Sequence, residues 1–419
     1  MYRTLAAILV MSASLAQAAL SQEEQANPRE SILTRDTLTG GFMGARDVLA
    51  KYGLDVALSG TGIYQHNVRG ALSTSNDNGR FSGSYDLEIA ADLETIGLIS
   101  GAGIYALIEG STMQGIDPYS VGSVFGVNAD AAGNREADVT ELWYEQTLGE
   151  NIFKVRIGKL DLTGGFECRG CPVSFDCNSF ANDETTQFLN NALVNNPTIP
   201  FPDNGLGLAL HWNPVEVWYA SAGISDAEAD AREAGFTTTF DGDSCFFYIA
   251  ETGLVPQINS PNGPLQGAYR LGFWVDSLPR EHFDGSGPSR NNKGLYLSFD
   301  QMLMVEGDDN SQGLGVFARM GWANEDVYDV HEFASAGVQY AGLIPGRGAD
   351  VTAIGFARGN LSNQAGYTED CESVIELYHR LRFTPWLGIT PSVQYVQNPG
   401  GDRSVDDAVA VALRVQAAF

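Results

Sequence analysis

Three closely spaced cysteines occur in the segment CRGCPVSFDC, at Cys168, Cys171 and Cys177. Thiolates at this spacing could bind zinc, but a zinc site needs a fourth ligand, and none of the five histidines lies near the cluster. Cys245 and Cys371 complete the five cysteines. In an exported protein such cysteines more commonly form disulfides, so all five are disulfide candidates. Five cysteines allow at most two disulfide bridges and leave one free thiol. The sequence leaves the pairing open.

The sequence contains no recognisable catalytic motif. A hydrolase would need a nucleophile beside a histidine, and the common Gly-x-Ser-x-Gly motif is absent from the sequence. We therefore predict that the protein is not an enzyme and needs no catalytic cofactor or metal. Acidic stretches at 306–310 (EGDDN) and 324–329 (NEDVYD) offer the carboxylate oxygens that calcium prefers, so structural calcium on acidic external loops stays open beside plain surface charge.

Charged and aromatic residues recur in strict alternation with apolar ones. In FKVRIGK (153–159), Phe153, Val155 and Ile157 share one face and Arg156 takes the other. This period of two belongs to strands with one apolar and one polar face. The polar face of all such segments supplies the side chains that we predict to line a pore. By this phase they are Glu88, Glu141, Trp143, Glu145, Arg156, Arg270, Trp274, Arg319, Arg380 and Arg382.

Sixteen alternating segments could position these side chains. Each has about ten residues, which is the length that a tilted transmembrane strand needs. The abundance of glycine, tyrosine and phenylalanine also favours strands and turns. We expect strands at 54–67, 82–94, 102–113, 137–148, 151–161, 206–213, 215–225, 245–254, 267–276, 294–305, 313–323, 332–343, 350–361, 373–384, 388–398 and 408–419.

The connections between these segments tend to alternate in length. Long ones include 114–136, 162–205 and 277–293, whereas 149–150 and 385–387 are short, and 255–266 is the exception. Outer-membrane β-barrels show this asymmetry, with short periplasmic turns and long external loops. We expect the longest loop, 162–205, either to fold inward and narrow the pore or to cap the surface.

The N-terminus predicts export. Arg3 precedes a mostly apolar run, and Ala16-Gln17-Ala18 fits a cleavage site, so we assign residues 1–18 to a signal peptide. No later apolar run is long enough for a membrane helix, and only helices and closed barrels cross bilayers. Residues 19–53 form a periplasmic segment in which 41–52 is expected to be a short helix, at the barrel mouth or in the lumen. The barrel itself takes 54–419.

The C-terminus ends on a strand rather than on a polar tail. Leu413, Val415 and Phe419 alternate with Arg414 and Gln416, so we expect the first three to face lipid and the last two the lumen. A final aromatic residue in this phase also resembles the signal read by the outer-membrane assembly machinery. A soluble secreted β-protein such as a lectin would leave these outward apolar bands unexplained.

Charge narrows the range of partners. The chain has 24 basic and 52 acidic residues, a formal net charge of −28, so it is not expected to bind nucleic acid. A lumen mixing arginines, carboxylates and aromatic rings suits neutral polyhydroxylated solutes, since sugar hydroxyls pair with both charge types and ring C–H groups stack on Trp or Tyr. The same charges could instead brace the wall.

The ordered motifs LTGGFMGARDVLAKYGLDVALSGTG, ELWYEQTL, VRIGKLD, GAYRLGFW, GLYLSFDQ, GLGVFARMGWA and ELYHRLRFTPWLGITPSVQYVQNPGG span nearly the whole mature chain. Together they resemble the OprB-type carbohydrate-selective outer-membrane porins. The resemblance implies a sixteen-stranded all-β barrel in the outer membrane of a Gram-negative bacterium, passing sugars into the periplasm by diffusion. It also implies a constriction rich in Arg and Glu, to which we assign Arg156, Lys159, Arg270 and Arg319.

A general or cation-favouring porin is the alternative function, favoured by the acidity of the chain and opposed by the inward arginines. The expected partners are permeating sugars, outer-membrane lipid and, through Phe419, the assembly machinery. The sequence leaves open whether the barrel is a monomer or a homo-oligomer.

Overall fold

The computed structural model describes residues 31–163, 175–233, 235–240, 244–306 and 309–419. The predicted signal peptide, 1–18, therefore lies outside the described residues, as do Cys168 and Cys171. Within the described helices, none is both long enough and apolar enough to cross a bilayer.

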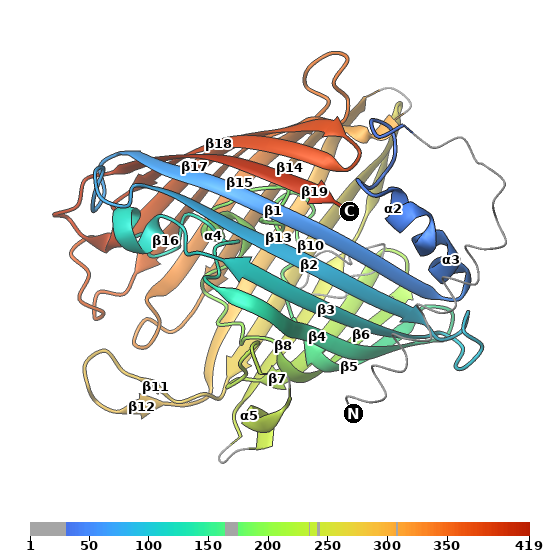
Figure 1. Ribbon diagram of the computed structural model, residues 1–419. Coiled ribbons are helices and arrows are strands. Elements are labelled where there is room, and N and C mark those ends of the chain that lie inside the picture. The colour runs from blue at the N-terminus through green and yellow to red at the C-terminus, as the bar shows by residue number, and fades with distance from the viewer. Residues whose placement is uncertain (1–30, 164–174, 234, 241–243, 307–308) are drawn as a thin grey trace.

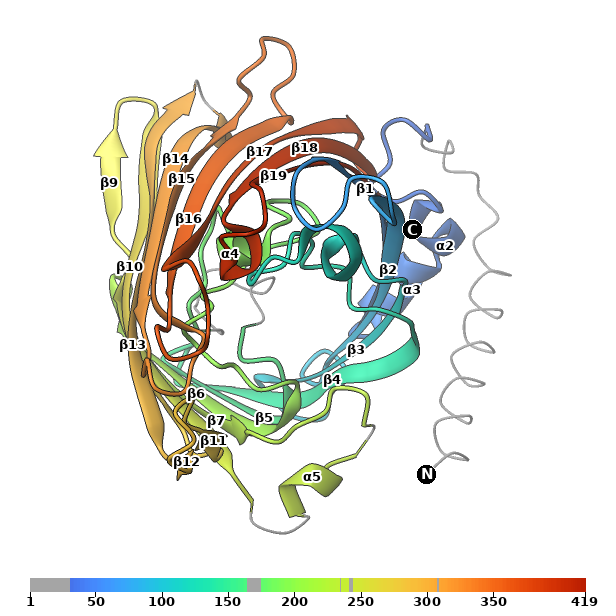
Figure 2. The ribbon, with the colours of Figure 1, turned by 90° about the vertical axis from the view of Figure 1, so that its left-hand side faces the viewer.

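In the described part of the chain, sixteen antiparallel strands form one closed barrel (Figures 1 and 2). Closure is made by the first and last strands, where Gly60 pairs with Ala417 and His66 with Val411. The predicted all-β barrel and its sixteen strand segments are confirmed. The barrel strands are β1 (Leu54–Arg69), β2 (Gly79–Asp92), β3 (Ala102–Thr112), β4 (Arg135–Leu148), β5 (Phe153–Leu160), β6 (Gly205–Val215), β7 (Trp218–Asp226), β8 (Phe246–Leu254), β10 (Gly263–Asp276), β13 (Asn292–Glu306), β14 (Asp309–Trp322), β15 (Val330–Ala341), β16 (Val351–Leu361), β17 (Cys371–Thr384), β18 (Leu387–Gln397) and β19 (Ala408–Ala418).

Two short hairpins extend beyond the barrel. β9 (Gln257–Ser260) pairs with the first residues of β10, which explains why the connection 255–266 is long for its place. β11 (Arg280–Glu281) and β12 (Pro288–Ser289) form a separate two-stranded sheet at the other, long-loop end. The short turns therefore gather at one end of the barrel and the long connections at the other.

Alternating burial shows that the strand phase was predicted correctly. On β10, Leu271 and Phe273 are exposed on the outer surface, whereas Arg270 and Trp274 are buried on the inner side. The last strand follows the same rule, since Arg414 is buried and its neighbours Leu413 and Val415 are exposed. The backbone N–H of Phe419 donates to the carbonyl of Leu58 on β1 at 2.9 Å, which ties the final residue to the closing seam.

The predicted N-terminal helix forms as two pieces, α2 (Gly40–Met43) and α3 (Ala45–Lys51), at the short-turn end (Figure 1). Figure 2 shows both pieces outside the ring of strands, so they lie at the mouth, the first of the two expected positions, rather than in the lumen. Arg46 forms an ion pair with Asp55 at 3.3 Å, and Leu38 donates its N–H to the carbonyl of Ala418. These contacts hold the segment beside the start of β1 and the end of β19.

The remaining described helices are short and lie in the connections. They are the π-helical turn η1 (Asp117–Val121), α4 (Asn191–Val194), α5 (Thr237–Phe240) and the 3-10 turn η2 (Pro399–Gly401). Cys177, Cys245 and Cys371 are all buried, in the β5–β6 connection, directly before β8 and at the first residue of β17. Disulfide pairing stays a prediction.

Candidate permeation channel

Two long connections, 113–134 and the described part of 162–205, fold into the barrel and pack against its inner wall. Figure 2 shows them within the ring of strands. Phe188 stacks edge-on against Tyr378 of β17 with ring centroids 5.0 Å apart, and lies 5.6 Å from Phe317 of β14. All three rings are buried in one apolar cluster. The inward folding expected for the longest loop is confirmed for its described residues.

Arg319 of β14 links the wall to the loop through several contacts. Its guanidinium lies 3.4 Å from the carboxylate of Asp176 and donates to the carbonyls of Leu193 (3.1 Å) and Asp176 (3.2 Å) and to the side chain of Asn182 (3.0 Å). Burial raises the pKa of the Asp176 carboxyl to about 6, against the opposing effect of Arg319. Each of these partners belongs to the loop.

Carboxylates on the wall accept hydrogen bonds from backbone N–H groups of the loops. Glu376 accepts from Leu189 (3.0 Å) and Asn190 (2.9 Å), just before α4. Glu251 accepts from Asp176 at 2.8 Å, and from the hydroxyls of two wall tyrosines. Glu251 is missing from the predicted set, although its inward phase in the segment 245–254 would have identified it.

Three predicted pore-lining residues face inward but lie beneath the loops. Arg270 forms a buried ion pair with Asp300 at 2.7 Å, and Asp300 also accepts from Ser179 of the loop. Trp274 is fully buried in a cluster with loop and wall aromatics. With Arg319, these side chains occupy the space between wall and loop rather than the open surface of a channel.

Lys159 has a comparable position near the long-loop end of β5. Its ammonium donates to the carbonyls of Ala231 (2.7 Å) and Glu233 (2.6 Å), and its side chain is buried. Lys159 thus anchors the connection between β7 and β8.

The inner face of β2–β5 is different because its charged side chains bond to one another rather than to a described loop residue, and because Glu145 and Lys154 stay partly exposed while Arg156 and Glu141 are buried. Trp143 of β4 stacks on Tyr105 of β3 with centroids 4.9 Å apart, and the Arg156 guanidinium lies over the indole at 3.7 Å. Arg156 also donates to Glu145 at 2.8 Å, and Glu145 lies 3.5 Å from Lys154. The Glu145 and Lys154 side chains are 17% and 20% exposed, compared with 0% for Arg319.

Two further carboxylates complete this arrangement. Glu141 accepts from the indole N–H of Trp143 at 2.8 Å, and Glu88 accepts from the hydroxyl of Tyr105 at 3.1 Å. The structure therefore brings together the predicted residues Glu88, Glu141, Trp143, Glu145 and Arg156. We call these five, with Tyr105 and Lys154, the aromatic–charge ladder. Tyr105 is absent from the predicted set, although its alternation with Ile104 places it on the inward face.

The two predicted arginines of β17 occupy different levels. Arg380 is half-buried and donates to Gln416 at 3.1 Å. Arg382 is exposed at the short-turn end, next to the β17–β18 turn, where it donates to the carbonyl of Pro385. The pairing of the two strands also becomes irregular between Arg382 and Thr384. Arg382 therefore lies at the mouth of the barrel. Its phase in the strand had predicted a position in the interior, and that prediction is wrong.

Two loop carboxyls lie near the inner wall, Asp130 beside Asp86 of β2 and Glu184 in the segment that Arg414 of β19 binds. Burial raises the pKa of Asp130 to about 7, and nearby Asp86 raises it further. Burial likewise raises the pKa of Glu184 to about 8, with Asp183 adding to the effect. Both groups are therefore largely protonated at pH 6, which reduces the negative charge of the interior.

No group of three or more metal-ligating side chains occurs among the described residues. The stretch 306–310, which we expected in an external loop, instead connects β13 to β14 at the short-turn end, and part of it lies outside the described residues. The stretch 324–329 does lie in a long-loop-end connection. Calcium binding stays a prediction.

A closed barrel with an outer apolar surface, loops folded into its bore and charged groups on the remaining inner wall defines a porin of the outer membrane. Residues 77–419 match the family described as carbohydrate-selective porin, OprB family. The chain belongs to this family, as the sequence motifs predicted, and its place is the Gram-negative outer membrane.

Individual relatives agree with this assignment. The chain is 23% identical to Porin B of Pseudomonas aeruginosa, over 91% of each chain, and 23% identical to Porin AaxA of Chlamydia abortus, over 72% of this chain and 60% of that one. Among solved structures, the high-pH structure of Pseudomonas putida OprB has a TM-score of 0.81 at 20% identity, covering 93% of this chain and all of the other. Its low-pH structure gives a TM-score of 0.60 at 19% identity.

Proposed function

We propose that sugars diffuse through this porin along the aromatic–charge ladder on β2–β5, and that the ladder provides the selectivity for carbohydrates. The observation that carries the proposal is Trp143, held between Tyr105 on one side and the Arg156 guanidinium on the other. On the opposite wall, Arg319, Glu251 and Glu376 are bonded to loop groups. The ladder instead offers polar groups to a passing solute.

The chemistry of the ladder suits a neutral polyol. Carboxylates at Glu88, Glu141 and Glu145 accept from sugar hydroxyls, and Arg156 and Lys154 donate to them. Aromatic edges provide an apolar surface for the C–H groups of a sugar ring. Since each group already has a protein partner, a sugar exchanges existing hydrogen bonds for new ones, which supports weak binding and rapid release, as diffusion requires.

A cation-favouring pore is the second candidate, supported by the loop carboxyls Asp130 and Glu184. Their raised pKa values argue that this negative charge is weak near pH 6 and grows above pH 8. At low pH both candidates predict little preference for cations. At high pH only the cation-favouring pore predicts a strong one. As part of the same proposal, the chain acts as a channel alone and catalyses no reaction, and Phe419 is the contact for the assembly machinery.

Single-channel recording in planar bilayers tests the proposal, with glucose or maltodextrins added to potassium chloride. Trp143→Leu should weaken sugar block by up to about tenfold, since a stacked aromatic contributes roughly 0.5–1.5 kcal/mol, while ionic conductance changes little. Trp322→Leu, on the lipid-facing side, is the matched control and should leave block unchanged. Unaltered sugar block in Trp143→Leu, with an intact control, would refute the ladder as the sugar path.

A further inference from the structure

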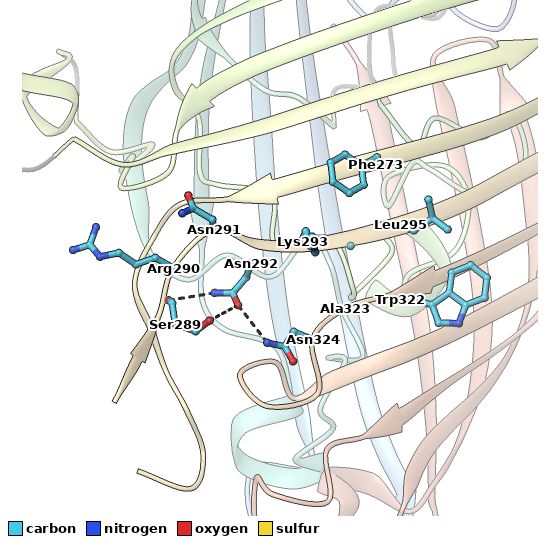
Figure 3. A pocket seen from close by; sticks show the side chains of 11 residues that line it. Phe273, Ser289, Arg290, Asn291, Asn292, Lys293, Leu295, Trp322, Ala323 and Asn324 are labelled. Carbon is cyan, nitrogen blue, oxygen red and sulfur yellow. Dashed lines mark hydrogen bonds between the residues drawn. The ribbon is translucent and has the colours of Figure 1, made fainter. Parts of the chain in front are cut away.

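A groove of about 550 Å³ lies on the outer, lipid-facing surface at the external ends of β10, β13 and β14 (Figure 3). Its apolar floor is a row of paired residues. Phe273 of β10 lies opposite Leu295 of β13, and Leu295 lies opposite Trp322 of β14. Their exposed fractions are 44%, 40% and 37%, so the row is available to a ligand.

Two cations line the external side of this floor. Lys293 pairs with Val275, two residues beyond Leu295, and strand alternation puts it on the same outer face. Arg290 lies in the turn that leads from β12 into β13, and Figure 3 shows it extending away from the apolar row. Both are exposed, and within the described part of the chain neither has an ion-pair or side-chain hydrogen-bond partner.

The charge of the groove contrasts with that of the whole protein. No Asp or Glu lines it, although acidic residues outnumber basic ones 52 to 24 in the chain, and Lys293 is one of only four lysines. The buried side chain of Asn292 holds the turn between the two cations. It accepts from the Ser289 hydroxyl at 2.9 Å and from Asn324 at 3.4 Å.

We propose that this groove binds a phosphorylated lipid of the external leaflet, with the phosphate between Arg290 and Lys293 and an acyl chain along Phe273, Leu295 and Trp322. A lysine on the lipid face costs roughly 2–4 kcal/mol at mid-depth but nearly nothing at the interface, so Lys293 marks headgroup level. Lysine and arginine are the usual phosphate ligands, and basic groups at this level attract anionic headgroups.

A second groove, on β7, β8, β10 and β13, provides an internal comparison. It has a volume of about 500 Å³ and lies closer to the periplasmic end, lined by Trp218, Leu254, Tyr269 and Leu297. Arg270 contributes to its edge, but the guanidinium is buried on the inner side in its pair with Asp300. This groove therefore offers apolar contact without an outward cation, so we expect it to accept acyl chains regardless of the headgroup.

Native mass spectrometry of the purified, folded barrel in detergent tests the inference. The probe is bisphosphorylated lipid A, compared with the same lipid after removal of both phosphates. We expect one tightly bound phosphorylated lipid, and about 25-fold weaker binding by Arg290→Gln/Lys293→Gln, or about fivefold for each cation. Loss of phosphate from the lipid should weaken binding to the unaltered protein by a similar factor.

Arg358→Gln is the matched control because Arg358 is also an exposed, outward-facing cation near the external end of a strand, on β16, away from the groove. It should change affinity less than twofold. Equal losses for Arg358→Gln and Lys293→Gln would overturn the proposal in favour of diffuse charge attraction. Equal binding of the dephosphorylated lipid would overturn it in favour of acyl contact alone. Heat-dependent migration of each variant in gels establishes that its barrel is folded.

Discussion

Replacing Arg319 with alanine should release the inward-folded loop and widen the pore. The change removes the ion pair to Asp176 and the hydrogen bonds to Leu193 and Asn182, and it leaves the Asp176 carboxylate without its cation. Removing one partner of a buried ion pair typically costs about 3–5 kcal/mol. We expect the loop, rather than the barrel, to absorb this cost, because the strands keep all their backbone pairing.

Single-channel conductance is the assay, together with limited proteolysis of the loop. Arg319→Ala should raise ionic conductance, increase current noise and expose the loop to protease. Asp176→Asn in the same chain should recover part of the loss, because it removes the unpaired buried charge. Wild-type conductance and protease resistance in Arg319→Ala, combined with a selective loss of sugar block, would refute the anchoring role and indicate direct contact with the solute.

Three other predictions follow from the same structure. Raising the pH from 6 to 9 should ionise Asp130 and Glu184, because their pKa values are raised to about 7 and 8. The added negative charge should increase the ratio of cation to anion permeability roughly two- to fivefold in reversal-potential measurements. A constant permeability ratio would contradict their position at the pore. Gly272→Ala should destabilise the barrel by about 1–3 kcal/mol, because a Cβ there would lie 1.9 Å from the buried Tyr296 ring. The loss should appear as a lower temperature for the heat-induced gel shift. Gly103→Ala on β3 is the control, since a Cβ there would meet nothing nearer than 3.5 Å. Deleting Phe419 should lower the amount of folded porin in outer-membrane fractions while leaving the conductance of the assembled channels unchanged, whereas equal yields would argue against its role in assembly.

The strand pattern could be predicted from the sequence because a membrane barrel imposes one simple rule. Each strand must show apolar side chains to lipid and polar ones to the bore, so a period of two fixes both the strand and its phase. Trp143, Arg156 and Glu145 were therefore placed on the correct face. The same rule says nothing about what covers that face. Arg270 and Arg319 follow this rule as Arg156 does. They are nevertheless covered by the described part of the loop 162–205, about which the alternation within the strands gives no information.

The exceptions have local causes that period-two reasoning does not contain. Arg382 lies outside the interior because it stands next to the β17–β18 turn, where its guanidinium reaches the carbonyl of Pro385. Lys159 follows Gly158, whose φ of +142° is rare for other residues, and it contacts carbonyls about 70 residues further along the chain. Such partners depend on how long connections fold, which nearest-neighbour sequence patterns do not determine.

The inward loops also suggest a reason for part of the acidity of the chain. A loop inside a barrel brings backbone N–H groups into a space with little water, and each buried N–H needs an acceptor. The backbone carbonyls of a wall strand cannot accept these hydrogen bonds, because they are paired with the neighbouring strands. Side chains of the wall must therefore act as the acceptors. Glu376, Glu251 and Glu372 each accept from loop N–H groups in this way. Carboxylates are well suited because one group can accept from two or three donors at once. Acidic residues on the inner wall therefore need not signal cation selectivity, and carboxylates that hold a loop must be left out when the charge that a solute meets is counted.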